Sequence, residues 1–215
     1  MNTITRRNLL ASVAVAPFAS AVAPHAEPAG RGSVKAGPGA RYFPNVILRT
    51  HENRTVRFYD DLIKDRTVLI TFMYATCEGI CPGTILNLRK VHQRLADRAG
   101  RDVFIYSITL KPKEDTPEVL RRYAAMHGAG PGWLFLTGQP DDLELLRREL
   151  GFVDPDPLLA RDSTSHMGVI LYGNERLHRW AACPALGNPD QIFRSILWME
   201  GQMPVPPNAA ITTGK

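Results

Sequence analysis

A run of seven apolar and β-branched residues, Thr67 to Met73, restricts the fold of this chain more than any other feature. The run reads Thr-Val-Leu-Ile-Thr-Phe-Met and lacks the alternation of apolar and polar residues that marks a strand with one face in water. A strand that is covered on both faces is apolar along most of its length. The run therefore predicts a central strand of a sheet that has helices packed on both sides.

Strand and helix patterns alternate along the rest of the chain. Helical spacing of apolar residues predicts helices over about 83–98, 116–127, 140–150 and 190–200. Apolar and β-branched runs predict strands over 45–49, 55–58, 102–108, 133–136, 167–172 and 177–180. Strand–helix–strand units with short connections imply a parallel sheet, and hairpins at both ends make the sheet mixed. The predicted fold class is therefore α/β, a thioredoxin-like mixed sheet with helices on both faces and an N-terminal β-hairpin.

The first 26 residues have the pattern of an export signal. A polar start carries Arg6 and Arg7, an apolar stretch runs to about Phe18, and residues 19–21 fit a cleavage site between small residues. Adjacent arginines ahead of two leucines resemble a twin-arginine signal, which predicts a periplasmic protein. A general secretory signal and an uncleaved membrane anchor are the alternatives, although a spanning helix needs about 20 apolar residues and this stretch is short.

Composition separates one domain from its flanking segments. Residues 27–41 are rich in Gly, Pro and Ala and are expected to form a flexible linker, and residues 203–215 are expected to be a disordered tail. A single domain, residues 42–202, remains. The formal net charge is +5, without a block of Lys and Arg interleaved with aromatic residues, so nucleic-acid binding has no support. We expect a monomer.

Two cysteines, Cys77 and Cys81, follow the apolar run closely, in Tyr74-Ala-Thr-Cys-Glu-Gly-Ile-Cys-Pro82. Ligands of open α/β sheets gather at the carboxyl ends of strands, where this segment lies. If a helical turn begins near the pair, its four-residue spacing places both sulfurs on one face, and the helix N-terminus favours thiolate over thiol. Thiolates are soft ligands that select Cu(I), zinc or iron–sulfur clusters.

Three interpretations of this cysteine pair compete: a structural pair, a dithiol that exchanges disulfides, and a metal site. Redox dithiols of the thioredoxin type typically have two intervening residues, whereas this pair has three, which leaves room for a metal between the sulfurs. A peroxiredoxin-like peroxidase and a redox or copper sensor also remain open. The third cysteine, Cys183, is expected to be a buried core thiol, with a disulfide or relay partner as the alternative.

His166 distinguishes the metal interpretation from the redox interpretation. It lies in Asp162-Ser-Thr-Ser-His-Met-Gly168, just before a predicted strand, where a thioredoxin-type reductase usually has a cis-proline. A histidine at this place would face the sulfurs and add a nitrogen ligand of intermediate softness. Two thiolates and one imidazole suit three-coordinate Cu(I), and a further weak ligand suits Cu(II). The other five histidines are not expected to have a special role.

Four segments carry a family resemblance: residues 71–82, residues 106–124, residues 132–138, and His166 before a strand. Taken together and in this order, they resemble the Sco/SenC copper proteins over roughly residues 44–200. The resemblance implies a thioredoxin-like fold and copper, as Cu(I) or Cu(II), bound by the residues that match Cys77, Cys81 and His166. It also implies a role in assembling the dinuclear copper centre of cytochrome c oxidase.

We interpret the chain as a metallochaperone rather than a turnover enzyme. Its partner would be the copper-receiving subunit of cytochrome c oxidase or another copper protein. Without copper, the same dithiol would reduce a partner disulfide, with Cys77 attacking and Cys81 resolving, so a thiol–disulfide oxidoreductase is the alternative. Members of the family commonly have an acidic residue before the histidine, and many keep an N-terminal anchor. This chain has Ser165 there instead, which removes a carboxylate that could tune the imidazole.

Overall fold

The computed structural model describes residues 38–153 and 168–202. The predicted export signal, residues 27–37 of the predicted linker, His166 and the C-terminal tail lie outside the described residues. In the part of the chain that is described, no helix combines the length and the apolar character needed to cross a membrane.

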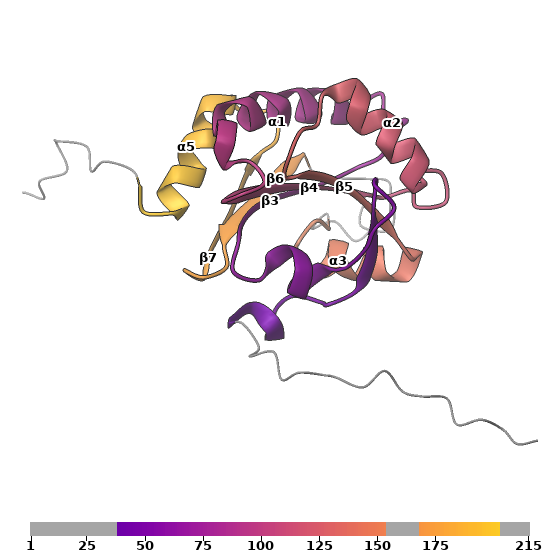
Figure 1. The fold of residues 1–215 in the computed structure, drawn as a ribbon, viewed down its shortest axis with the longest axis horizontal. Coiled ribbons are helices and arrows are strands. Elements are labelled where there is room, and N and C mark those ends of the chain that lie inside the picture. The colour runs from indigo at the N-terminus through magenta and orange to yellow at the C-terminus, as the bar shows by residue number, and fades with distance from the viewer. Residues whose placement is uncertain (1–37, 154–167, 203–215) are drawn as a thin grey trace, which may run out of the picture. The chain divides into compact units, whose positions relative to one another are not determined.

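A seven-stranded sheet with the order β2-β1-β5-β4-β3-β6-β7 forms the centre of the fold (Figure 1). The strands are β1 (Ile47–Thr50), β2 (Thr55–Arg57), β3 (Thr67–Met73), β4 (Val103–Thr109), β5 (Trp133–Gly138), β6 (Val169–Asn174) and β7 (Arg179–Pro184). The central strands β3, β4 and β5 are parallel, and β1 and β6 join them antiparallel. The predicted mixed sheet and N-terminal hairpin are thus confirmed.

Helices cover both faces of the sheet. Figure 1 shows α1 (Cys81–Leu95), α2 (Pro117–His127) and α5 (Pro189–Met199) on one face, and α3 (Pro140–Glu149) with the π-helix η2 (Phe58–Ile63) on the other. Two short 3-10 helices, η1 (Pro38–Arg41) and η3 (Ala96–Arg98), complete the described elements.

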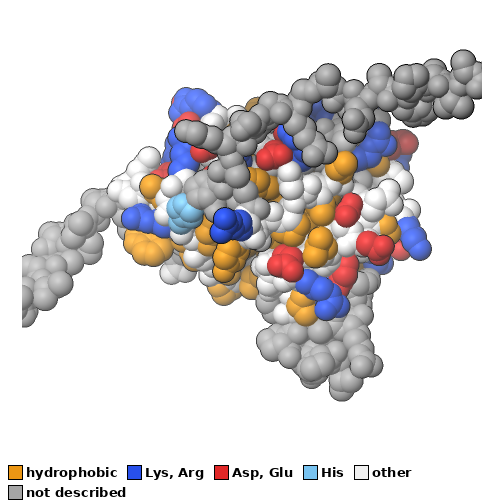
Figure 2. Space-filling model, turned by 90° about the horizontal axis from the view of Figure 1, so that it is seen from below, with side chains coloured by type: hydrophobic (Ala, Val, Ile, Leu, Met, Phe, Trp, Pro, Cys, Tyr) orange, Lys and Arg blue, Asp and Glu red, His pale blue; other side chains and the backbone are white. Residues whose placement is uncertain are grey.

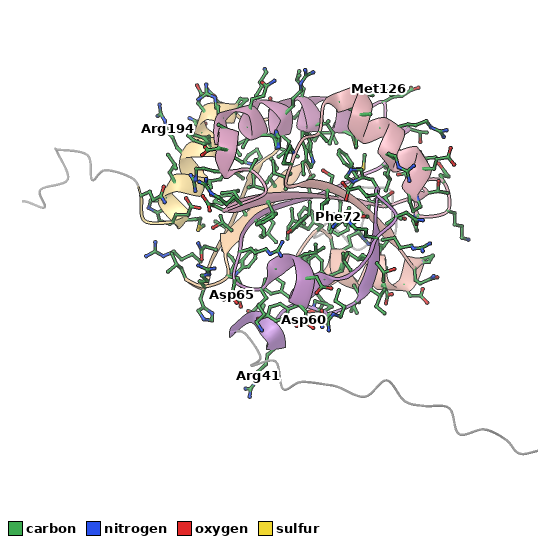
Figure 3. All side chains as sticks on the ribbon, in the orientation of Figure 1. Arg41, Asp60, Asp65, Phe72, Met126 and Arg194 are labelled. Atoms are coloured by element: carbon green, nitrogen blue, oxygen red, sulfur yellow. The ribbon has the colours of Figure 1, made fainter. Side chains whose placement is uncertain are left out.

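The strand β3 is apolar throughout because it contributes to two cores. All seven of its residues are buried. Leu69 and Met73 pack beneath α1, α2 and α5, whereas Val68, Ile70 and Phe72 pack toward η2 and α3. In Figure 3, Phe72 lies in the interior. Successive side chains of a strand point to opposite faces, so a strand between two cores needs an apolar residue at nearly every position.

The last four residues of the predicted linker, 38–41, belong to the described part of the chain. These residues form η1, and Gly39 is buried. The Gly39 N–H donates to the carboxylate of Glu175 over 2.9 Å, and the Tyr59 hydroxyl and the Asp65 N–H donate to the same carboxylate over 2.8 and 3.0 Å. The buried Glu175 carboxylate thereby holds the start of the described chain against the β6–β7 hairpin.

The closing hairpin is shifted from the expected position. The strands were expected to end at Tyr172 and to resume at Leu177, but β6 continues to Asn174 and β7 begins at Arg179, opposite Asn174. The turn forms at residues 175–178 because the Asn174 side chain accepts the Leu177 N–H over 3.1 Å. As a result, β7 extends to Pro184 and includes Cys183.

Candidate metal and dithiol site

The two cysteines lie between the end of β3 and the first residue of α1. Cys77 belongs to the connecting loop, where its N–H donates to the Tyr74 carbonyl over 3.2 Å, and Cys81 begins the helix. The condition for aligning the two sulfurs by helical spacing is not met, because Cys77 precedes the helix. The fold of the loop brings them together instead, and the two cysteine side chains are hydrogen-bonded to each other.

The loop stabilises a thiolate at Cys77. Burial by itself raises the pKa of Cys77, since this side chain is only 8% exposed. Hydrogen bonds from the Cys81 side chain, from the backbone N–H groups of Cys81 and Gly79, and from Tyr74 outweigh burial, so the pKa of Cys77 lies below its ordinary value. Free N–H groups at the start of a helix favour an anion. The predicted direction of this shift is confirmed for Cys77.

Cys81 shifts in the opposite direction. Burial, together with the hydrogen bond and the charge of Cys77, raises the pKa of Cys81 to about 12, although the Tyr74 backbone counteracts part of this rise. The pair therefore consists of Cys77, which forms a thiolate more readily, and Cys81, a deeply buried thiol that is 1% exposed. A metal ion that binds both sulfurs would have to displace the proton of Cys81.

Asp115 holds the loop that carries Cys77 and was not identified from the sequence. This residue is 1% exposed, and its Oδ2 accepts the Ala75 N–H over 3.1 Å and the Thr109 hydroxyl over 2.5 Å. Burial raises the pKa of Asp115. The contacts tie the start of the cysteine loop to the end of β4. In the sequence, an Asp before Thr116-Pro117 is an ordinary signal for the start of a helix. Only its place in residues 106–124, the second segment of the family resemblance, could have indicated a role at the site.

The chain enters β6 beside the cysteine loop. Gly168 lies directly against Ile80, which is the residue just before Cys81. The contact is so close that a Cβ on Gly168 would overlap Ile80 Cδ1. The Gly168 carbonyl also accepts the Ala185 N–H over 2.7 Å. His166, the predicted third ligand, lies two residues before Gly168 and outside the described residues. Within residues 38–153 and 168–202, no three His, Cys, Asp or Glu side chains are grouped to hold a metal ion.

Cys183 belongs to strand β7 and not to the loop and helix start that carry the pair. It is paired with Ile170 of β6, and no disulfide joins any of the three cysteines, which all lie in the described part of the chain. The expectation of a buried core thiol is met only in part, because Cys183 is half-buried and packs at the edge of the core under α1 and α5. Burial raises its pKa to about 11.

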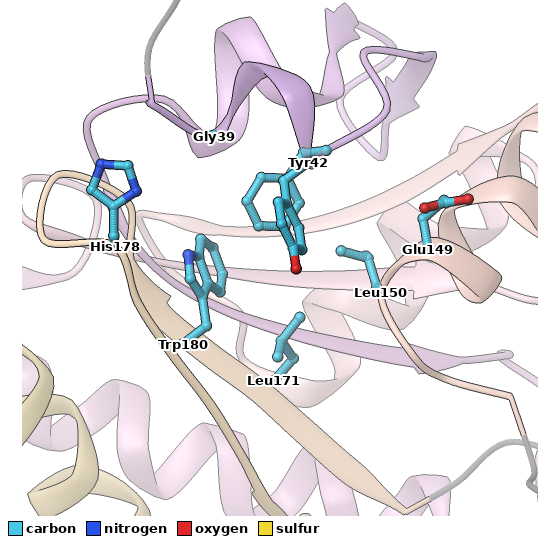
Figure 4. Close-up of a pocket in the computed structure, with 8 residues that line it drawn as sticks. Gly39, Tyr42, Glu149, Leu150, Leu171, His178 and Trp180 are labelled. Carbon is cyan, nitrogen blue, oxygen red and sulfur yellow. The ribbon is translucent and has the colours of Figure 1, made fainter.

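A cavity of about 420 Å³ lies away from the cysteines, between η1, the end of α3 and the β6–β7 hairpin (Figure 4). Its described lining is mainly apolar and consists of Gly39, Tyr42, Phe43, Glu149, Leu150, Leu171, His178 and Trp180. In the view from below, hydrophobic side chains are grouped beside a histidine (Figure 2). Because this lining offers no thiol, the cavity is not part of the dithiol site.

Fold and site together define a class of protein: a thioredoxin-like α/β protein whose dithiol follows a central parallel strand and opens a helix. The family model described as SCO1/SenC matches residues 48–175, more than half of the chain. The chain therefore belongs to the SCO1/SenC family.

Individual relatives agree with this assignment. A Stutzerimonas stutzeri protein named as a candidate copper-binding protein is 29% identical over 133 residues, which are 61% of this chain and 63% of that protein. The match thus spans less than two thirds of the relative. The structure of Arabidopsis thaliana ScoI with copper bound has a TM-score of 0.59 at 17% identity and covers 75% of this chain and 99% of the other.

A third relative is BsSco, whose structure is described with a disulfide switch and as a member of the Sco family of cytochrome c oxidase assembly proteins. It has a TM-score of 0.59 at 20% identity and covers 74% of this chain and 92% of the other. At these identities, the two structural likenesses establish the shared fold.

Proposed function

We propose that this protein binds copper through Cys77, Cys81 and His166 and delivers it during assembly of the dinuclear copper centre of cytochrome c oxidase. The observation that carries the proposal is the contact of Gly168 with Ile80, between the cysteines. Two residues span at most about 7 Å of chain. We therefore propose that His166, two residues before Gly168, uses this short connection to bind the same metal as the two sulfurs. Two thiolates and an imidazole form a soft ligand set that suits Cu(I).

Copper is the cargo of this reaction, and delivery is an exchange of ligands. The bonds from copper to Cys77 and Cys81 break as bonds to the thiolates of the acceptor form, and the oxidation state of copper stays the same. The acceptor thiols release their protons, and the donor sulfurs can take protons up. The raised pKa of Cys81 favours its return to the thiol and therefore assists release. The copper-binding name and the copper-bound structure among the relatives support the cargo.

We further propose that the chain is exported to the periplasm by the twin-arginine route, on the strength of Arg6 and Arg7 ahead of an apolar stretch. Changing both residues to lysine is expected to retain the chain in the cytoplasm. The measurement is the amount of the chain in periplasmic and cytoplasmic fractions. Undiminished export of the double-lysine variant would contradict this route.

Thiol–disulfide exchange is the second candidate function, and the contrasting pKa shifts of the two cysteines favour it specifically. The Cys77 thiolate would attack a partner disulfide and form a mixed disulfide, releasing the first partner thiolate. Cys81, after losing its proton, would then attack the Cys77 sulfur and release the second. The partner gains two electrons and the pair becomes a disulfide. Among the described residues, no arginine is a main cause of the pKa shift of Cys77.

Replacing His166 with alanine tests the copper proposal against this alternative. The wild-type protein is expected to bind one copper per chain with a thiolate-to-Cu(II) absorption band. His166→Ala is expected to lose that band and at least about tenfold in copper affinity, since even outer-shell partners contribute 10–100-fold. Equilibrium titration against a competing chelator measures the affinity.

The matched control is His92→Ala, because His92 lies on α1 some 11 residues beyond Cys81, about 16 Å along the helix. Its ring contacts the Pro131 carbonyl over 2.9 Å, so the control removes an imidazole and leaves the dithiol intact. Copper binding by His166→Ala that equals the control, combined with full disulfide-reductase activity, would exclude the copper proposal in favour of the second candidate.

A further inference from the structure

Two exposed leucines lie together next to the dithiol. Leu86 on α1 is 50% exposed, and Leu186, in the turn after β7, is 57% exposed. Leu186 lies over Gly83, since a Cβ on Gly83 would be 2.7 Å from Leu186 Cδ2. Gly83 and Leu86 are three residues apart on the helix and share a face. We call the surface formed by Leu86 and Leu186 the leucine patch; Leu186 covers Gly83, two residues after Cys81, and Leu86 follows Cys81 by five residues.

The turn that carries Leu186 is held in place by specific hydrogen bonds. The side-chain amide of Asn87 donates to the carbonyls of Ala185 and Gly187 over 2.9 and 3.0 Å. Within the turn, the Gly187 N–H donates to the Pro184 carbonyl over 3.0 Å, and Ala185 is fully buried. Leu186 is therefore the outward residue of a fixed turn. An apolar side chain that is already ordered loses little conformational freedom when a partner covers it.

A positive charge borders the leucine patch. Lys90 is exposed and lies four residues after Leu86, on the same face of α1. Beyond it, Arg94 forms an ion pair with Asp190 at the start of α5. The surface thus consists of an apolar centre with a cationic edge. Such a surface is complementary to a partner surface that has apolar side chains with a carboxylate beside them. The charge of Lys90 at the edge would mainly affect how fast the two proteins associate.

We propose that the leucine patch, with Lys90 at its edge, is the surface on which the copper-accepting protein docks. This inference rests on the proposed function, because ligand exchange requires the acceptor thiols to reach bonding distance of the donor sulfurs. A docked protein must therefore cover a surface adjacent to the cysteine loop. The leucine patch meets this requirement from α1 and from the turn after β7.

Binding of the metal-free proteins tests the docking surface without copper. The full chain, labelled with ¹⁵N, is titrated with the metal-free soluble copper domain of a cytochrome c oxidase subunit, and amide shifts are recorded by NMR. We expect shifts concentrated in residues 83–90 and 184–187. Shifts confined to other elements, or no shifts at all, would overturn the inference. Failure of the proposed copper site would leave this result unaffected, so the two can be told apart.

Variants of the leucine patch test its energetic role. Leu86→Gln and Leu186→Gln are each expected to weaken binding of the same copper domain by about tenfold, as for a central apolar contact in an interface. The matched control is Leu145→Gln, since Leu145 is 42% exposed but lies on α3, across the sheet. We expect the control to bind like the wild type. Equal binding by both patch variants and the wild type would exclude the patch.

Transfer kinetics separate docking from copper binding itself. With copper loaded, both patch variants should transfer it more slowly to the protein domain but lose it at the wild-type rate to a small chelator, which needs no docking surface. Lys90→Glu should slow transfer mainly at low salt, since the effect of an edge charge is screened by ions. If the patch variants transferred copper equally slowly to the domain and to the chelator, the inference would be contradicted. Self-association of the wild-type protein that the patch variants abolish would contradict it as well.

Discussion

Replacing Cys77 or Cys81 with serine is expected to lower copper affinity by at least about a hundredfold. Mutating a residue that only hydrogen-bonds to a metal ligand already costs about 10–100-fold, and loss of the ligand itself should cost more. A hydroxyl is a harder and far less acidic ligand than a thiol, so it does not replace a thiolate on copper. Serine is close to cysteine in size, and both positions pack in the core beneath α1, so the fold should persist. Competition titration measures the affinity, and circular dichroism checks the fold.

The third cysteine supplies the control for these two variants. Cys183→Ser also exchanges a sulfur for an oxygen in a free thiol, but this thiol lies in β7 and makes no hydrogen bond to the pair that shifts their pKa values. We expect its copper stoichiometry and affinity to match those of the wild type. A Cys77→Ser protein that binds copper as tightly as the Cys183→Ser protein would show that copper binds elsewhere.

Replacing Glu175 with alanine is expected to lower the free energy of unfolding by about 3–5 kcal/mol. The change leaves two buried donors, the Gly39 N–H and the Tyr59 hydroxyl, and the part-buried Asp65 N–H without an acceptor. Each unsatisfied buried donor costs about 1–3 kcal/mol. A typical domain has only 5–15 kcal/mol of stability, so the loss should be readily measured by urea unfolding of the metal-free protein. The control is Glu118→Ala, an exposed residue paired with Arg122, with an expected change below about 1 kcal/mol.

The same carboxylate predicts how stability depends on pH. Burial raises the pKa of Glu175, but the hydrogen bonds from Asp65, Gly39 and Tyr59 outweigh burial, so its pKa lies below the ordinary value in the folded protein. The stabilisation is therefore complete above the unfolded pKa, about 4.3, and is lost as the pH falls through the lower folded pKa. Glu175→Gln should show a smaller loss of stability between pH 6 and acid than the wild type. Parallel pH profiles for the two proteins would contradict this assignment.

The elements that could be predicted from the sequence are those with local signals. The apolar run 67–73 identified the central strand because a two-sided strand needs apolar side chains at successive positions. The helix at 117–127 begins and ends where its residues indicate: Thr116 accepts the Val119 N–H, and Gly128 adopts a left-handed conformation with φ of 67°. Element ends were less well predicted where a side-chain hydrogen bond within the turn or a distant carboxylate sets them, as at Asn174 and at η1.

By itself, the sequence determined that a cysteine pair follows a doubly covered strand, since both features are encoded by neighbouring residues. It also carried the resemblance that the family match confirmed. Only the tertiary structure decided that Cys81 is the first residue of the helix, that Cys77 rather than Cys81 has the lowered pKa, and that Asp115 holds their loop. The physical reason is that these properties depend on how deeply the fold buries each thiol and on the path of the loop, which Asp115 fixes from a distant part of the chain. Neither leaves a local pattern in the sequence.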